Sequence, residues 1–155
     1  MSPAPHSAGI LPYRRTVAGL EVLLVHPGGP FWKNKGDGAW SIAKGLLESG
    51  EDVRAAALRE FAEETGVALE GELLPLGVER QPSGKTIHAF AVEAELDAAA
   101  IVSNTFELEW PPKSGQMRGF PEVDAASWFP VEAARDKILK GQRPFLDRLL
   151  SLIEA

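Results

Sequence analysis

Three glutamates whose spacing brings their carboxylates together are the strongest chemical feature of this chain. Glu60, Glu63 and Glu64 stand at positions i, i+3 and i+4, so on a helix their side chains share one face. Like charges at these spacings cost about 0.2–0.5 kcal/mol per pair even on an exposed helix, so a cation is expected to offset the repulsion. Oxygen ligands on one rigid face suit Mg²⁺ or Mn²⁺, which bind carboxylates, waters and substrate phosphates together. The simpler interpretation is a solvated acidic face, with Arg59 and Glu63 as an ion pair.

A helix from about Asp52 to Thr65 is predicted to carry these carboxylates. Its acidic start suits the helix dipole, and Gly66 stands where a left-handed C-terminal cap is usual. At 100° per residue, one face of this helix collects small and apolar residues, namely Ala55, Leu58, Phe61, Ala62 and Thr65. The three glutamates fall on the opposite face. We therefore expect the helix to bury one side in the core and to present the carboxylates on the other.

The residues around the glutamates stand in a fixed register that extends beyond the helix. This register consists of Gly45, Glu51, Arg59, Glu60, Phe61, Glu63, Glu64, Gly66 and Val67. The segment GLLESGEDVRAAALREFAEETGV, residues 45–67, resembles the Nudix box, in which G, five residues, E and seven residues precede R-E-hydrophobic-x-E-E-x-G-hydrophobic. Every specified position matches. The resemblance implies an α/β fold, the Nudix-type α/β/α sandwich with a mixed sheet, and the order of predicted strands and helices agrees with a mixed sandwich.

The resemblance also implies a chemistry, the metal-dependent hydrolysis of a nucleoside diphosphate linked to another moiety. Under this resemblance Glu60, Glu63, Glu64 and the backbone carbonyl of Gly45 would hold Mg²⁺ or Mn²⁺. Arg59 would hold this part of the helix through an ion pair. Glu60, Glu64 and Arg59 are therefore the expected catalytic residues.

Two further roles stay open in the sequence. Glu51 is expected either to align the metal ligands from behind or to serve as a simple acid at the helix start. The general base is Glu60 by default, because different branches of the family place the base on the box helix or on a downstream loop. The alternatives are acids in or beside a late predicted strand and loop: Glu107, Glu109 and Glu122.

Lys44, next to the first glycine of the box, is the expected substrate-binding residue. Relatives with this arrangement often act on highly phosphorylated substrates, so we expect Lys44 to contact phosphate and to lie away from the helix carboxylates. Many of these relatives carry proline where this chain has Ala43. This difference weakens the assignment to their subgroup and not the assignment to the family. Weaker candidates are lysines that would attract an anion (Lys33, Lys35, Lys85) and aromatic residues that would stack on a base (Phe31, Trp32, Trp40).

Alternating apolar residues and turn signals predict the remaining elements. Strands are expected over 8–14 and 20–26 as a hairpin, over 73–79 and 86–96 as a second hairpin, over 106–110, and over 126–129. Helices are expected over 130–139 and 144–153. Loops are expected over 27–38, which is rich in glycine and proline, and from Pro111 to about Asp124.

Length and composition limit the remaining possibilities. The 155 residues fit a single domain over 1–155, and the net charge of −6 excludes an overall basic field for long nucleic acid. The chain has no cysteine, which excludes disulfides and thiolate chemistry. No stretch approaches the roughly 18 apolar residues of a membrane span, and the first six residues do not resemble a signal peptide, so a cytoplasmic protein without membrane contact is expected. The oligomeric state stays open.

The leading functional hypothesis is a pyrophosphohydrolase that cleaves a phosphoanhydride in a nucleoside triphosphate or a dinucleoside polyphosphate, so the expected partner is a small phosphorylated nucleotide. An ADP-ribose or nucleotide-sugar pyrophosphatase is the alternative, because Pro82 lies 15 residues beyond Val67, a spacing that resembles that branch. A non-catalytic nucleotide-binding Nudix module is a third hypothesis. Such modules tend to lose box carboxylates, and this chain retains all of them.

Overall fold

The computed structural model describes residues 5–154, so the first four residues of the N-terminal segment lie outside the described part. In chain order the elements are β1 His6–Thr16, β2 Gly19–Pro27, β3 Ala43–Leu46, α1 Val53–Thr65, β4 Leu74–Arg80, β5 Thr86–Glu93, the short 3₁₀ helix η1 Ala98–Ala100, β6 Thr105–Glu109, β7 Met117–Pro121, β8 Val123–Pro130, α2 Val131–Lys137, the short 3₁₀ helix η2 Lys140–Gln142, and α3 Arg143–Glu154. The two predicted N-terminal and central hairpins, β1–β2 and β4–β5, are both present.

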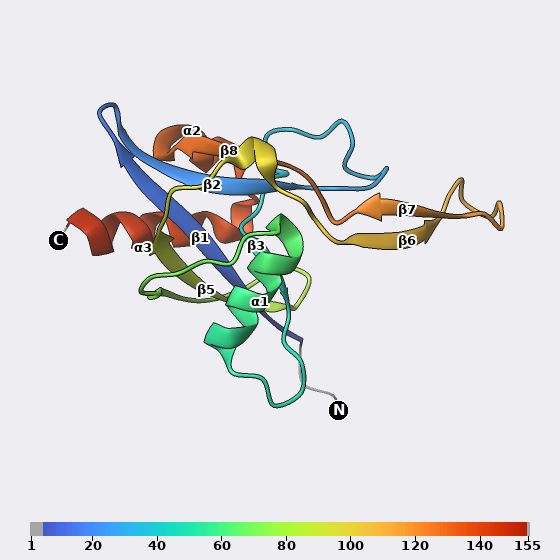
Figure 1. The fold of residues 1–155 in the computed structure, drawn as a ribbon, viewed down its shortest axis with the longest axis horizontal. Helices are drawn as coiled ribbons and strands as arrows, with labels where there is room; N and C mark the ends of the chain where they lie inside the picture. The colour runs from blue at the N-terminus through green and yellow to red at the C-terminus, as the bar shows by residue number, and fades with distance from the viewer. Residues whose placement is uncertain (1–4, 155) are drawn as a thin grey trace.

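A mixed sheet forms the centre of the fold (Figure 1). Its strand order is β4-β5-β1-β2-β8, and β3 pairs with β1. Strand β1 runs parallel to β5 and antiparallel to β2 and β3. Residues 7–10 of β1 pair with β3, whereas residues 13–16 pair with β2. Strand β3 therefore occupies the edge that β2 leaves free at the beginning of β1.

Helices cover both faces of this sheet because its central strands are apolar on both sides. Leu11 and Leu24 pack with Phe145 of α3, whereas the alternate residues Ile10 and Leu23 pack on the other side in the cluster that holds α1. Figure 1 shows α1 apart from α2 and α3, with the sheet between them. The expected α/β/α sandwich with a mixed sheet is confirmed.

The predicted loop from Pro111 to about Asp124 is wrong in part, because it contains β7. This strand pairs antiparallel with β6, and Phe106 lies opposite Phe120 while Leu108 lies opposite Arg118. Figure 1 shows the β6–β7 hairpin projecting from the end of the central sheet. The segment Met117–Pro121 has a single large aromatic residue and no alternation, so its strand depends on the partner that β6 supplies.

The predicted orientation of α1 is also wrong in part. Ala55 is exposed, whereas Ala56, Ala57, Phe61 and Thr65 are buried. Four apolar residues follow one another at positions 55–58. This run has little periodicity from which to predict the rotation of the helix. As a result, part of the carboxylate face turns toward β3 and not toward solvent. Strand β3, only four residues long, was not predicted at all.

None of the helices within residues 5–154 is long and apolar enough to cross a membrane.

Candidate active site

Local signals fix the two ends of α1. The Asp52 carboxylate accepts hydrogen bonds from the amides of Arg54 and Ala55, both at 3.1 Å, which satisfies two of the free N–H groups of the first turn. Gly66 ends the helix in the left-handed conformation at φ 77°, and its amide donates to the carbonyl of Ala62. Both predicted helix boundaries are confirmed to within one residue. The helix therefore presents its glutamates from a backbone that is capped at both ends.

Arg59 connects four parts of the site. Its Nε and Nη2 donate to the two carboxylate oxygens of Glu51, each at 2.8 Å, and its Nη1 donates to Glu60 at 2.9 Å and to Glu63 at 3.2 Å. Nη2 also donates to the carbonyl of Leu46, next to the first box glycine. The guanidinium, helped by the amide of Glu48, lowers the pKa of Glu51 to about 2. Arg59 therefore joins the segment before α1 to the carboxylates on α1. The ion pair that the sequence predicted for Arg59 is present.

Gly45 and Glu60 are in direct contact. A Cβ built on Gly45 would lie 1.9 Å from Oε2 of Glu60, so only glycine leaves room for this carboxylate against β3. The Glu60 side chain is 12% exposed. Burial raises its pKa, which the hydrogen bond from Arg59 opposes. The pairing of β3 with β1 therefore determines where the Glu60 carboxylate can lie.

Glu64 carries a buried carboxylate oxygen of the site. Its Oε2 is the one buried side-chain oxygen or nitrogen without a hydrogen-bond partner among residues 5–154. Burial raises the pKa of Glu64 to about 8, with a smaller opposing effect from the charge of Lys44. A buried oxygen without a partner is costly unless something binds it. The structure therefore contains a polar atom that is suited to a cation or a donor from a ligand.

Lys44 lies beside Glu64, which corrects the expectation that it would stand away from the helix carboxylates. The two residues line one cavity of about 160 Å³, together with Glu122. We refer to it as the carboxylate cavity. Burial lowers the pKa of Lys44, whereas the charge of Glu64 raises it. The rotation of α1 toward β3 is the reason for this proximity, because it turns Glu64 inward.

Of the three alternative bases, the structure brings only Glu122 to the carboxylate cavity. The amide of Glu122 donates to the carbonyl of Asn104, whose own amide donates to the carbonyl of Glu63 at the end of α1. Burial and the charge of Glu63 raise the pKa of Glu122. Glu107 and Glu109 are exposed on β6 and line none of the cavities described here, and Glu109 accepts a hydrogen bond from the amide of Lys113 at the hairpin tip.

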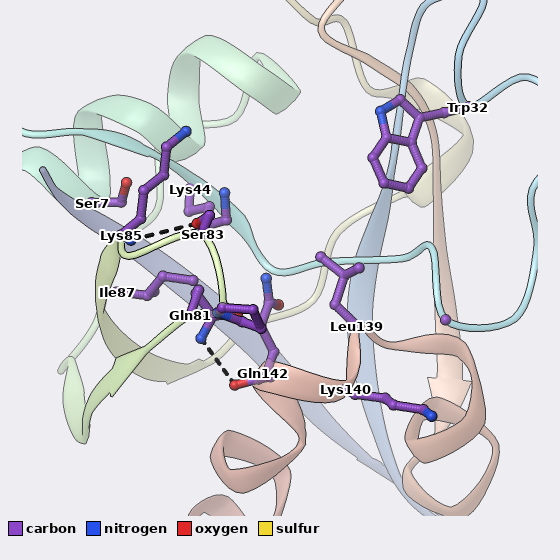
Figure 2. A pocket seen from close by; sticks show the side chains of 13 residues that line it. Ser7, Trp32, Lys44, Gln81, Ser83, Lys85, Ile87, Leu139, Lys140 and Gln142 are labelled. Carbon is purple, nitrogen blue, oxygen red and sulfur yellow. Dashed lines mark hydrogen bonds between the residues drawn. The ribbon is translucent and has the colours of Figure 1, made fainter.

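A larger cavity of about 600 Å³, which we call the cleft, adjoins the carboxylate cavity. Both are lined by Trp32, Lys44 and Leu139. Figure 2 shows Trp32 on the opposite side of the cleft from Lys44 and from the β4–β5 turn with Ser83 and Lys85. The cleft therefore has an aromatic wall facing a wall that carries ammonium groups. Its lining also includes Ser7, Gln81, Pro82, Ile87, Lys140 and Gln142.

Two cleft residues that the sequence did not single out come from the segment after α2. Gln142 is fully buried; its Oε1 accepts from the amide of Ile42, and its Nε2 donates to Oγ of Ser41, each at 3.0 Å. It holds η2 against the chain that leads into β3. Lys140, in the same short helix, adds a third lysine to the cleft. No local pattern marks either residue, because their role depends on contacts about 100 positions away in the chain.

The other aromatic and histidine candidates lie in different surroundings. Trp40 packs edge-on against Phe129 in the core and is a structural residue. Phe31 is 62% exposed and packs edge-on against Trp110 of the β6–β7 hairpin. His88 pairs with His6 on β1, and it lines neither the cleft nor the carboxylate cavity.

No three histidine, aspartate or glutamate side chains are already gathered as a metal site within the described residues, since Arg59 holds Glu60 and Glu63. The residue set nevertheless fits Mg²⁺ or Mn²⁺ in three respects. Glu64 has a buried oxygen without a partner, Gly45 leaves space that only a bare backbone allows, and all the available ligands are hard oxygens. The fit rests on donor chemistry and not on a preformed cluster.

Comparisons with known proteins agree with this arrangement. A segment of 69 residues is 45% identical to an RNA pyrophosphohydrolase from Dinoroseobacter shibae, and it covers 43% of this chain and 42% of that relative. An RNA pyrophosphohydrolase from Rhizobium meliloti is 27% identical over 86% of this chain and 88% of its own length. The crystal structure of a C. elegans Ap4A hydrolase binary complex superimposes with a TM-score of 0.69 at 18% identity, over 96% of this chain and 98% of that one.

The first of these matches spans less than half of the relative's length, whereas the match to the domain family spans nearly all of this chain. The family model described as NUDIX domain matches residues 4–149. The box register, the sandwich of helices around a mixed sheet and this match lead to one conclusion: the chain belongs to the NUDIX domain family.

Proposed function

We propose that this chain is a metal-dependent pyrophosphohydrolase that cleaves a phosphoanhydride in a nucleoside triphosphate or a dinucleoside polyphosphate. The observation that carries the proposal is the position of Lys44, which lines both the carboxylate cavity and the cleft. Lys85 and Lys140 also line the cleft. Three lysines in a cleft, one of which also lines the carboxylate cavity, suit a substrate with several phosphates, one end of which reaches a metal.

The proposed chemistry divides between a metal ion and the residues of the chain. Mg²⁺ or Mn²⁺ held by Glu60, Glu63, Glu64 and the carbonyl of Gly45 would neutralise phosphate charge and lower the pKa of a bound water. Arg59 keeps the glutamates in register through its contact with Glu51. Attack of water at one phosphorus breaks its bond to the bridging oxygen, which leaves with the second phosphate group, while a base takes the proton of the water. We propose Glu60 as the base. Of the three alternative bases, Glu122 has the most support, because it lines the carboxylate cavity.

Two alternative substrates have specific support. Pro82, the residue behind the ADP-ribose hypothesis, lines the cleft from the β4–β5 turn. The 5′ end of an RNA is the second alternative, because two of the similar proteins are named RNA pyrophosphohydrolases. The non-catalytic alternative is weakened by the presence of all the box carboxylates.

A product-resolved substrate screen tests the proposal. The panel contains nucleoside triphosphates, dinucleoside tetraphosphate, ADP-ribose and a 5′-triphosphorylated oligonucleotide, each with Mg²⁺ and with Mn²⁺. We expect the highest kcat/KM with a triphosphate or a dinucleoside tetraphosphate. Preferred cleavage of ADP-ribose or of the oligonucleotide would replace the proposed substrate class, and binding without turnover of any compound would favour the non-catalytic module.

Metal is expected to stabilise the folded protein, because an ion that binds the assembled carboxylates and not the unfolded chain shifts folding by mass action. At about 100 times its Kd, a ligand adds ~2.7 kcal/mol, and ~1 kcal/mol moves the Tm of a domain of this size by about 2–4 °C. Thermal melts with and without millimolar Mg²⁺ or Mn²⁺ measure the gain. Glu63→Gln should reduce it, and the exposed Glu70→Gln should not. An unchanged Tm in the wild type would instead support a solvated acidic face.

Lys44→Ala is expected to lower kcat/KM by an amount that grows with the number of phosphates, from ADP-ribose to a nucleoside triphosphate and dinucleoside tetraphosphate. The reason is that Lys44 can follow a phosphate chain from the carboxylate cavity into the cleft. Because Lys44 also opposes a cation next to Glu64, metal affinity should stay the same or rise. Kinetics on the three substrates and metal titrations measure both effects.

Lys113→Ala is the matched control for this series, since Lys113 is an exposed lysine at the hairpin tip. An equal loss on all three substrates, or no loss, would leave Lys44 without a role in phosphate chain length.

A further inference from the structure

A third cavity of about 480 Å³ lies between the loop after β2 and the β6–β7 hairpin, and we call it the hairpin cavity. Cross-strand pairing places Phe120 and Arg118 on the same hairpin face as Phe106 and Leu108. This face is in contact with the loop, since a Cβ on Gly29 would lie 3.0 Å from Cζ of Phe106. The cavity is lined by Gly29, Pro30, Lys33, Trp110, Arg118, Phe120, Pro121 and Asp124.

The lining of the hairpin cavity combines aromatic rings with positive charge. Trp110 packs edge-on against Phe31, with ring centroids 5.5 Å apart, so the cavity has a rigid aromatic wall. Lys33 and Arg118 are exposed and form no ion pair within residues 5–154. The one acid of the lining, Asp124, is bound to His26 at 2.8 Å. A planar ring attached to phosphate would match both features of this surface.

Neighbouring residues of one chain segment line the hairpin cavity and the carboxylate cavity. The segment from Pro121 to Asp124 lines both of the smaller cavities, with Glu122 and Val123 in the carboxylate cavity and its two end residues in the hairpin cavity. The cleft instead shares Trp32, Lys44 and Leu139 with the carboxylate cavity and shares no residue with the hairpin cavity. The cleft and the hairpin cavity therefore each combine an aromatic residue with basic residues, and each is linked to the carboxylate cavity through different residues.

We propose that the hairpin cavity binds the second nucleoside of a dinucleoside polyphosphate whose first nucleoside lies in the cleft, so that the polyphosphate between them crosses the carboxylate cavity. This inference rests on the function proposed above and narrows its substrate class. A nucleoside triphosphate or an RNA 5′ end carries nucleosides on only one side of its phosphates. Two nucleoside cavities are matched only by a molecule with a nucleoside at each end.

A buried histidine contacts the loop that forms one wall of the hairpin cavity. His26, a buried residue of β2, bonds the Asp124 carboxylate through Nδ1 at 2.8 Å and the carbonyl of Lys35 through Nε2 at 2.6 Å. This contact ties the loop to the beginning of β8. The same loop places Trp32 in the cleft and Lys33 in the hairpin cavity, so one segment contributes to both proposed nucleoside sites.

A titration with AMP tests the two cavities without any turnover. The chain has four tryptophans, each with one indole N–H signal in a ¹⁵N–¹H NMR spectrum, and Trp→Phe variants assign them. We expect AMP to shift the signals of Trp32 and Trp110. Trp128, whose indole donates to the carbonyl of Leu96, should not move. A shift of Trp32 alone, or of neither residue, would contradict the proposal.

Kinetics test whether one substrate spans both cavities. Trp110→Ala and Arg118→Gln should each lower kcat/KM for dinucleoside tetraphosphate at least tenfold and change that for ATP less than twofold. Met117→Ala is the control, because Met117 pairs with Glu109 on the other face of the hairpin and should leave both values unchanged.

The proposal would be overturned if these variants lost kcat/KM equally on ATP and dinucleoside tetraphosphate, or on neither. It would also be overturned if the loss were confined to a 5′-triphosphorylated oligonucleotide, a result that would assign the cavity to RNA. If the wild type cleaves none of these compounds, the proposed function fails, and the AMP titration still decides whether the hairpin cavity binds a nucleotide.

Discussion

Glu60→Gln and Glu64→Gln are each expected to lower kcat at saturating metal by at least about 10²-fold while the fold stays intact, which is the lower range for the loss of an acid–base or charge-stabilising group. Glu60 lies against the backbone of Gly45, and Glu64 carries the buried oxygen without a partner. An amide keeps the shape of each side chain but removes the negative charge that a divalent cation needs. Steady-state kinetics on the best substrate of the screen measure the effect.

Glu70→Gln, on an exposed part of the chain after α1, is the control for this pair and should retain wild-type turnover. Circular dichroism and thermal melts check the fold, and Glu64→Gln is not expected to lower the Tm, because a buried amide is easier to desolvate than a buried carboxylate. Turnover close to wild type in both Glu60→Gln and Glu64→Gln would remove the metal-site assignment.

The parts of the fold that the sequence predicted are those with local signals. Asp52 and Gly66 mark the ends of α1 through a side-chain cap and a left-handed backbone, and both signals act within four residues. The β4–β5 hairpin is likewise marked by its own turn, Gln81–Lys85, in which the amide of Gly84 donates to the carbonyl of Gln81. Such features need no knowledge of the rest of the chain.

The parts that the sequence did not predict depend on contacts between distant segments. Strand β3 exists because it pairs with β1, more than 30 residues earlier, and β7 exists because β6 pairs with it. The rotation of α1 could not be read from a run of alanines, so the sequence predicted the carboxylates on the face opposite the core, whereas Glu64 turns inward and lines a cavity with Lys44. Tertiary packing therefore decided the surroundings of residues whose types the box register had already identified.

The same limit applies to the cavities. Glu64 was singled out from the register and Lys44 from its place beside Gly45, but Lys85 from the β4–β5 turn and Lys140 from η2 also line the cleft. Lys85 was a weak candidate because an isolated lysine is usually exposed, and Lys140 had no signal at all. A cleft assembled from five segments of the chain becomes visible only when the sheet brings those segments together.

Gly45→Ala is expected to lower kcat by about 10²-fold, comparable to the cost of misplacing a reacting group by about 1 Å. The added Cβ would lie 1.9 Å from Oε2 and 2.1 Å from Cδ of Glu60, so the carboxylate or the strand must move. Movement of Glu60 also breaks its hydrogen bond from Arg59, while overpacking costs about 1–3 kcal/mol of stability. Steady-state kinetics and thermal melts measure the two effects separately.

Gly119→Ala controls for the general effect of adding a methyl group to a strand glycine, because a Cβ at Gly119 meets no atom within 4 Å. It should keep both turnover and Tm. If Gly45→Ala loses stability as expected but keeps wild-type turnover, the position of Glu60 against β3 does not matter for the reaction, and Glu60 can be neither the base nor a metal ligand fixed by that contact. If turnover and Tm both fall, the close approach of Gly45 and Glu60 serves catalysis as well as folding, which is the result that the closely packed carboxylate leads us to expect.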